Sequence, residues 1–373
     1  MQSETKRNGM RGEGVKFNIH SKPEFFREVV KRVNNHFKTT KQSKTGNGSM
    51  VFKTVFMIAL YMIPLALIVS QTVTSVWGNI AMWALMGFGM SGIGLSVMHD
   101  ANHGSYSKKK RVNNFVGLII NFVGGYHVNW KIQHNVLHHT FTNIHGLDDD
   151  ISKNNTLRLS PHQEKKGFHK YQIFYAPFLY SILSLYWFLG KDIEQTIKYG
   201  KENLVQEQGL SVRRAFIEIT IAKLAYLGLF IILPIMTSSI LWWQTLLGFL
   251  LMHAICGQVL ALIFQCAHVL EETDFFIPDD EGSMENSFAI HQMRTTSNFA
   301  NGSTFFSWFI GGLNYQIEHH LFPNICHVHY KDISKIVKST AMEYNVPYNH
   351  HTTFVDALKS HFTVLNRLGT GHI

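Results

Sequence analysis

The stretch WGNIAMWALMGFGMSGIGLSVM at residues 77–98, followed at once by HDANH at residues 99–103, decides how this chain folds. The first part carries no charged residue, and at about 1.5 Å per residue its length matches the ~30 Å hydrocarbon core of a bilayer. In the second part His99 and His103 are four residues apart, so a helix places both side chains on one face. The stretch therefore predicts a membrane helix that delivers two histidines to the membrane surface.

Three further apolar runs are long enough to cross a bilayer. Residues 51–70 form a first hairpin with the quoted stretch, and residues 215–237 and 240–267 form a second hairpin. A fifth run, residues 171–189, carries Tyr, Trp and Pro along its length, which favours a helix in the membrane interface. We therefore expect an all-α integral membrane protein with four transmembrane helices in two hairpins, a cytoplasmic helical cap and interfacial helices.

The distribution of positive charge predicts the orientation of this multi-pass protein. The formal net charge is +9, and the Lys and Arg residues lie outside the hairpin tips, which carry no charge. The positive-inside rule then places both termini and all the histidine stretches on the cytoplasmic face. We expect a cytoplasmic N-terminal segment with an amphipathic helix (residues 1–50), a membrane domain (51–340) and a cytoplasmic C-terminal tail (341–373). No nucleic-acid motif accompanies the charge, so membrane lipid is its expected partner.

Two further histidine stretches, HNVLHH at residues 134–139 and QIEHH at residues 316–320, point to metal binding. On a helix His134 and His138 reach into the same space. His139 is rotated by about 100° from His138, so an HH pair splits its rings between neighbouring targets. Two such pairs suit two metal ions held side by side. Imidazole ligands without cysteine suit iron, zinc, copper or nickel.

One histidine outside these stretches belongs with them. His268 directly follows the last apolar run, so it lies at the same membrane depth as His99. A metal-bound histidine usually passes its second N–H to a carboxylate or carbonyl. Asp100 and Glu318 are candidates for that part, while Asp148–Asp150 could instead cap a helix.

Two other interpretations account less well for the histidines. The chain has 22 histidines, so some clustering arises by chance, but three clusters, each beside an apolar run, do not fit that explanation. A membrane metal transporter would place its ligands in mid-membrane on broken helices. Here only His253 lies in mid-membrane, and it stands alone.

These motifs together resemble those of the membrane fatty acid desaturases. The resemblance rests on HDANH, HNVLHH, QIEHH and the continuation HHLFP at residues 319–323, and it covers about residues 50–340. Glutamine at the start of the third stretch resembles the front-end branch, of linoleoyl-CoA Δ6-desaturase type, which inserts a double bond between an existing one and the carboxyl end. The runner-up is a related membrane di-iron hydroxylase of a lipid or alkane.

The resemblance implies a non-haem centre of two iron ions, O2 as co-substrate, and a fatty acyl substrate linked to CoA or to a lipid. Carried over by position, the expected metal ligands are His99, His103, His134, His138, His139, His268, Gln316, His319 and His320.

This sequence differs from many related enzymes in how it would receive electrons. Many eukaryotic front-end enzymes carry a fused cytochrome b5 domain with an HPGG motif, which is absent from this sequence. We therefore expect a bacterial type with a separate donor, cytochrome b5-like or ferredoxin-like, and its reductase. Residues 77–98 and 240–267 could wall the acyl slot. Candidates to line its entrance are His127, Trp130, Arg294 and Asn298.

Overall fold

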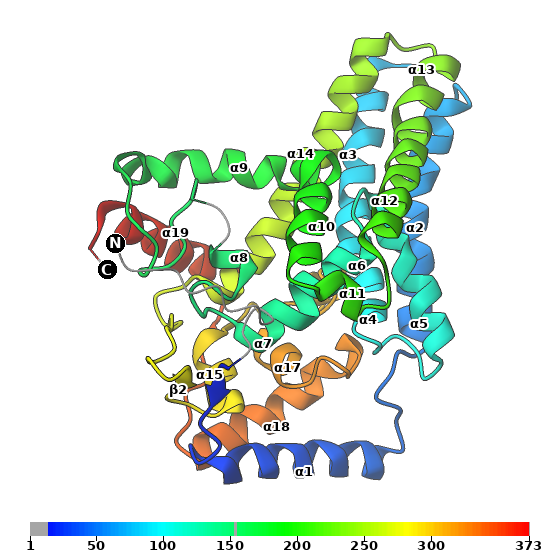
Figure 1. Ribbon diagram of the computed structural model, residues 1–373. Coiled ribbons are helices and arrows are strands. Elements are labelled where there is room, and N and C mark those ends of the chain that lie inside the picture. The colour runs from blue at the N-terminus through cyan, green and yellow to red at the C-terminus, as the bar shows by residue number, and fades with distance from the viewer. Residues whose placement is uncertain (1–13, 153–154, 373) are drawn as a thin grey trace.

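The computed structural model describes residues 14–152 and 155–372, and it is helical almost throughout (Figure 1). Five helical stretches are long and apolar enough to cross a membrane: Gly48–Val69, Val76–Asn102, Gly167–Lys201, Val212–Thr237 and Trp242–His268. The predicted helical class is therefore confirmed, and the chain is a multi-pass membrane protein.

Four of these stretches form a bundle of roughly parallel helices (Figure 1). They comprise α2 (Gly48–Val69), α3 (Val76–Gly92), α12 (Val212–Leu227) with η6 (Gly228–Ile232) and α13 (Leu233–Thr237), and α14 (Trp242–His268). Glycines let the helices approach closely. A Cβ at Gly89 would lie 2.7 Å from the Tyr61 backbone nitrogen, and one at Gly248 would overlap the Trp83 ring. Close packing through small residues holds membrane helices together without help from water.

The second span continues past the expected end of its apolar run. α3 passes into the π-helix η1 (Ile93–Val97) and then into α4 (Met98–Asn102), so His99 lies on the helix itself. All of η1 and α4 is buried. The last turns of this span are therefore enclosed by protein.

The fifth stretch is arranged differently from the other four. It contains η4 (Gly167–Tyr171), α9 (Gln172–Tyr186), the π-helix η5 (Trp187–Lys191) and α10 (Asp192–Lys201). Figure 1 shows α9 extending sideways from α14, transverse to the bundle, and α10 turning to run beside α12. α9 packs along α14, and its outer side exposes apolar side chains such as Phe174 and Phe178.

A layer of helices covers the end of the bundle opposite the hairpin tips (Figure 1). α1 (Pro23–Thr40) packs on α18 (Tyr330–Glu343) through buried Phe25, Val29 and Val33. The amphipathic helix expected within residues 1–50 thus lies on protein, while residues 1–13 fall outside the described part. The expected C-terminal tail contains α19 (Phe354–Thr370), which packs against η4, α9 and α14.

The remaining elements are short. Two parallel pairs of two-residue strands join distant segments, β1 (Lys16–Phe17) with β2 (Ser283–Met284) and β3 (Asn298–Phe299) with β4 (His350–His351). The short helices are α5 (Lys110–Gly117), η2 (Leu118–Val123), α6 (His127–Trp130), η3 (Lys131–His138), α7 (His139–Phe141), α8 (Asp149–Ser152), α11 (Leu204–Glu207), α15 (Phe288–Thr295), α16 (Thr304–Phe309), α17 (Gln316–Leu321) and η7 (His327–His329).

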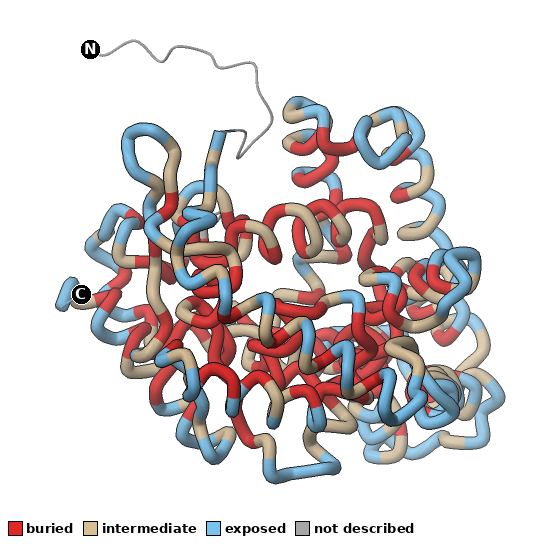
Figure 2. Tube along the Cα trace, turned by 90° about the horizontal axis from the view of Figure 1, so that it is seen from below, coloured by how far each residue is buried: buried red, intermediate tan, exposed pale blue. Residues whose placement is uncertain are grey.

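The molecule has a buried interior and an apolar outer surface on the helix bundle. Figure 2 shows buried residues gathered in the middle of the molecule and exposed residues on its outer turns. On the bundle, large apolar side chains such as Phe52, Ile63 and Trp77 are exposed. Soluble proteins rarely expose apolar surface of this extent. This exterior is the one expected for helices in contact with acyl chains.

Candidate metal centre

Four histidines from three helices converge in a first group. His99 and His103 come from the end of the second span, His134 from η3 and His319 from α17, and one ring nitrogen of each lies within 4.8 Å of the others. His99 Nε2 is 3.2 Å from His134 Nε2. His103 is half-buried and the other three are buried.

Three histidines form a second group beside the first. His138 comes from η3, His268 from the last turn of α14 and His320 from α17, and all three are buried. The Nε2 atom of each finds no hydrogen-bond partner among the described residues. Three buried acceptor nitrogens that face one another without partners form the ligand set expected around a cation.

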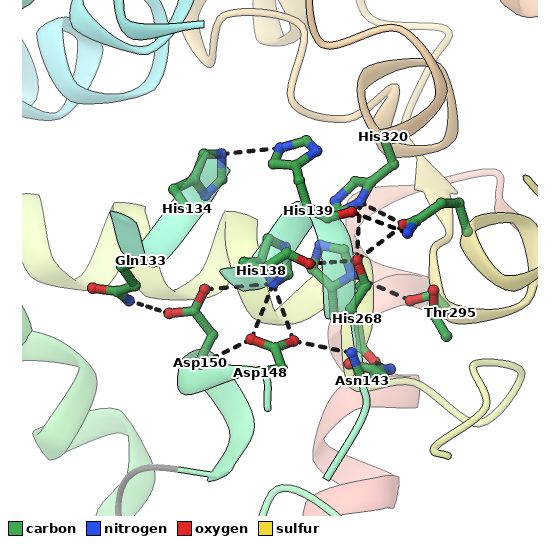
Figure 3. Close-up of polar contacts among 12 residues, drawn as sticks. Gln133, His134, His138, His139, Asn143, Asp148, Asp150, His268, Thr295 and His320 are labelled. Carbon is green, nitrogen blue, oxygen red and sulfur yellow. Dashed lines mark hydrogen bonds and ion pairs between the residues drawn. The ribbon is translucent and has the colours of Figure 1, made fainter. Parts of the chain in front are cut away.

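The opposite nitrogen of each ring in the second group is held by a neighbour (Figure 3). His138 Nδ1 lies 3.1 Å from Asp148 Oδ2, His268 Nδ1 lies 3.2 Å from the Thr295 carbonyl oxygen, and His320 Nδ1 lies 2.9 Å from Gln292 Oε1. Each acceptor selects the tautomer with hydrogen on Nδ1 and leaves an Nε2 lone pair toward the group. Outer partners of this kind orient metal ligands in proteins.

His139 lies between the two groups. Its Nε2 is 2.9 Å from His319 Nε2 and 3.3 Å from His134 Nε2, and its ring stacks on His320 at 4.3 Å between centroids. The HH pair at 319–320 divides its rings between the two groups, and the pair at 138–139 likewise points in two directions.

The second stretch corrects the expected helical geometry. The sequence spacing assumed an α-helix, but residues 131–138 form the π-helix η3. A π-helix repeats between residues i and i+5. His134 therefore lies over His139 at the first group, while His138 turns to the second, although His134 and His138 still come close together beside Asp150.

Burial keeps most of these rings uncharged. It lowers the pKa of His103, His134, His139, His319 and His320, and neighbouring histidines lower it further. Neutral imidazole is the form that binds metal. Burial acts in the same direction on the pKa of His138, but the nearby Asp148 and Asp150 carboxylates outweigh it and raise that pKa.

Two acidic side chains have partners that the sequence did not indicate. Asp148 caps α8 as expected, because its Oδ1 accepts from the Asp150 backbone N–H, but its Oδ2 also contacts His138 and accepts from the Asn143 backbone N–H. Glu318 contacts no histidine of the two groups: it accepts from Asn298 Nδ2 at 2.8 Å and from the Tyr348 hydroxyl at 3.0 Å. Burial raises the pKa of Glu318 to about 7 against these two hydrogen bonds.

Two other expected residues lie beside the groups. Asp100 Oδ1 is 3.7 Å from His99 Nδ1. Gln316, the first residue of α17, is buried beside His268, and its Oε1 has no hydrogen bond of good geometry to the other described residues. The acceptors from Gln292 and Thr295 could not be identified from the sequence, because neither residue belongs to a histidine motif.

Of the four residues considered for a substrate entrance, one faces the centre. The Trp130 ring packs 4.5 Å from the His134 ring and 5.6 Å from the His99 ring, centroid to centroid. Asn298 is buried against Glu318, and Arg294 forms ion pairs with acidic surface side chains. His127 is half-buried beside Tyr126.

A surface cavity of about 490 Å³ reaches the first group at His103. Lys108, Lys110 and Lys131 line it together with small polar residues. The half-buried His103 is thus the ring of the first group that lies closest to a basic, solvent-accessible hollow.

Comparison with known proteins identifies similar chains along almost the whole sequence. The model of the family described as fatty acid desaturase matches residues 75–352. An sn-1 linoleoyl-lipid 6-desaturase from Synechocystis sp. is 35% identical over 361 residues, which cover 96% of this chain and 98% of that protein. A protein of the same name from Arthrospira platensis is 34% identical, with 92% of each chain covered. An acyl-lipid (8-3)-desaturase from Physcomitrium patens is 33% identical, with 93% of this chain and 72% of that protein covered.

Proposed function

The chain belongs to the fatty acid desaturase family, and we propose that it is a front-end desaturase acting on an acyl chain linked to a membrane lipid. It is an oxidoreductase that introduces double bonds into fatty acyl chains. Two relatives that match over nearly their full length are named as linoleoyl-lipid 6-desaturases, which supports a polyunsaturated, lipid-linked substrate. Gln316 at the start of the third stretch supports insertion on the carboxyl side of an existing double bond.

The observation that carries the proposal is the convergence of two histidine groups with unpartnered nitrogens. Eight histidines and Gln316 would hold two iron ions: His99, His103, His134, His138, His139, His268, Gln316, His319 and His320. The donor set fits iron, because it consists of neutral imidazoles with outer partners that orient them. Gln316 offers an amide oxygen, a weaker ligand than imidazole.

The reaction balances as follows. One O2, two electrons and two protons from outside, together with two hydrogens of the acyl chain, yield one double bond and two waters. When bound, the iron pair would supply the oxidising power that removes hydrogen from unactivated C–H bonds. A donor protein must supply the two electrons. We propose a separate cytochrome b5-like or ferredoxin-like protein with its reductase.

The chain's own residues perform the positioning. Burial keeps bulk water from every ring of the two groups except the half-buried His103, and Asp148, Thr295 and Gln292 keep the Nε2 atoms of the second group turned inward. Trp130 covers one side of the first group with an apolar surface. An acyl chain that enters beside this ring would meet the reacting centre away from solvent.

We further propose that four of the five apolar stretches span the membrane, with α9 in its interface. Such an arrangement would put both termini and both histidine groups on one side of the membrane, and the positive-inside rule supports the cytoplasmic side. Residues 51–340 would then form the membrane desaturase domain, and residues 1–50 and 341–373 would form cytoplasmic segments. The transverse direction of α9 in Figure 1 and its exposed aromatic side chains support an interfacial position.

The decisive experiment is expression in a host that contains ferredoxin and is fed linoleate, beside a His138→Ala control. Total fatty acids are read by mass spectrometry after double-bond derivatisation. A new double bond on the carboxyl side of the existing ones, absent from the control, is the expected result. A hydroxylated product would contradict the proposal in favour of a hydroxylase. Purified protein without iron would contradict the di-iron assignment.

A further inference from the structure

A buried lysine lies close to the first histidine group. Lys53 is the only charged residue of α2 and is 1% exposed, and its Nζ is 2.6 Å from His327 Nε2. A buried charge inside a membrane protein is costly and marks a function by default. The proposed reaction assigns no role to the Lys53 ammonium.

His327 connects this lysine to Asp100. His327 Nδ1 lies 2.7 Å from Asp100 Oδ2, and the same oxygen accepts from Cys326 Sγ at 2.9 Å and from the His327 backbone N–H at 3.3 Å. The other carboxylate oxygen, Oδ1, faces His99 Nδ1 at 3.7 Å. Within the described residues His99 Nδ1 has no hydrogen-bond partner, and the Asp100 carboxylate is the acidic group that faces it.

The chemistry of the three groups determines where the protons lie. An ammonium carries only donors, so His327 Nε2 must accept from Lys53. The remaining proton of a neutral His327 then lies on Nδ1 and is donated to Asp100. Burial lowers the pKa of His327, Asp100 opposes that change and Lys53 adds to it, and the net shift is downward. The negative charge of Asp100 therefore faces His99 Nδ1 and favours a proton there.

Asp100, Cys326 and His327 lie close enough to hold a cation of their own. The ammonium of Lys53 already occupies the free side of His327, and Asp100 Oδ2 already accepts three hydrogen bonds. A further cation would meet the positive charge of Lys53 at contact distance. In this cluster His327 bridges a buried ammonium and a buried carboxylate, so the two charges already balance each other.

We propose that Lys53 and His327 are positioning residues for metal binding: through Asp100 they hold His99 with its proton on Nδ1 and its Nε2 lone pair turned to the first group. This Lys53 relay, Lys53–His327–Asp100, joins three segments distant in sequence. The relay would orient His99 in the way that the Asp148 carboxylate orients His138. Unlike Asp148, it includes a positive charge, Lys53, from the first membrane helix. The inference rests on the proposed di-iron site.

The test is a Co²⁺ titration of metal-free protein, followed by the visible absorption of bound Co²⁺ and by metal per chain. Lys53→Met removes the ammonium, Lys53→Arg keeps a cation, and His327→Leu breaks the relay at its centre. Lys223→Met is the matched control, because Lys223 is another lysine of a membrane helix whose Nζ pairs at 2.9 Å with a buried carboxylate, Asp192. Its ion pair belongs to neither histidine group.

We expect Lys53→Met and His327→Leu to weaken one of two Co²⁺ sites about 10- to 100-fold, as outer partners do. Lys53→Arg should retain most of the affinity, and Lys223→Met should match the wild type. Unchanged affinity and spectrum in both Lys53→Met and His327→Leu would overturn the inference, as would an equal loss in Lys223→Met. If either Lys53→Met or His327→Leu does not fold, the Co²⁺ affinity of the other variant tests the inference. A wild-type protein that binds no Co²⁺ or iron would refute the proposed function itself.

Discussion

At the residue scale, the centre depends on which nitrogen of each ring carries the proton. His138, His268 and His320 each have one nitrogen held by an acceptor and one without a partner among the described residues. Two of the acceptors are neutral, and the third, Asp148, is a buried carboxylate. The second group should therefore be most sensitive to the loss of that charge.

Asp148→Asn tests this sensitivity. The amide keeps the size of the side chain but removes the nearer of the two carboxylate charges that face His138 Nδ1, so we expect metal affinity and desaturation to fall about 10- to 100-fold. Iron per purified chain and product yield measure the effect. The exposed loop residue Asp280 provides the control, and equal iron content in Asp148→Asn and Asp280→Asn would contradict the assignment.

His268 and His253 offer a matched pair on α14. Both are buried on this helix, but His268 belongs to the second group while His253 bonds to Ser184 and Tyr226. We expect His268→Ala to lower bound iron from two ions per chain toward one and to abolish desaturation. His253→Ala should keep its iron per folded chain. Loss of iron in His253→Ala but not in His268→Ala would show that His253, and not His268, binds the metal.

At the scale of elements, the described residues contain four π-helices, and two of them, η1 and η3, lie at the histidine stretches. η1 precedes His99 and η3 carries His134 and His138, so a π-helix leads into or carries each of the first two histidine stretches. π-Turns concentrate at functional sites because they turn side chains out of the regular register. Here the changed register gives neighbouring histidines separate targets.

One ion pair between elements predicts a pH dependence. Glu272, in the loop after α14, pairs with His351 of β4. Burial alone would raise the pKa of Glu272, but His351 outweighs it and the pKa is lowered from 4.5, while the Glu272 hydrogen bond raises the pKa of His351 above 6.5. The carboxylate contribution to stability is lost as pH falls below 4.5, and the histidine contribution is lost as pH rises through the raised pKa. The pair therefore stabilises most between these limits.

Thermal unfolding in detergent from pH 5.5 to 8.5 checks this expectation. The pair is partly exposed, so its contribution is at most about 1 kcal/mol. The difference in melting temperature between wild type and His351→Gln should shrink as the pH rises. A difference that is constant or grows over this range would show that His351 is not charged in the fold.

At the scale of the whole molecule, the number of spans decides whether the histidine stretches share one side. All three native cysteines are buried, so single introduced cysteines can report topology with a membrane-impermeant maleimide. In the four-span arrangement, cysteines replacing Glu164 and Lys201 are labelled from the cytoplasmic side, and those replacing Thr72 and Ser239 from the other side. Labelling of Glu164→Cys and Lys201→Cys from opposite sides would show that the stretch Gly167–Lys201 crosses the membrane.

Local features of the chain were enough to predict the apolar helices and the residues of the candidate centre. Hydropathy along residues 77–98 and the spacing of histidines depend on neighbours in sequence. The structure places seven of the eight expected histidines in two adjacent groups and His139 between them. The π-helix η3, the partners Gln292 and Thr295, and the Lys53 relay depended on the tertiary structure. Their contacts join segments as far apart as Lys53 and His327, and such proximity follows from how helices pack rather than from any local pattern.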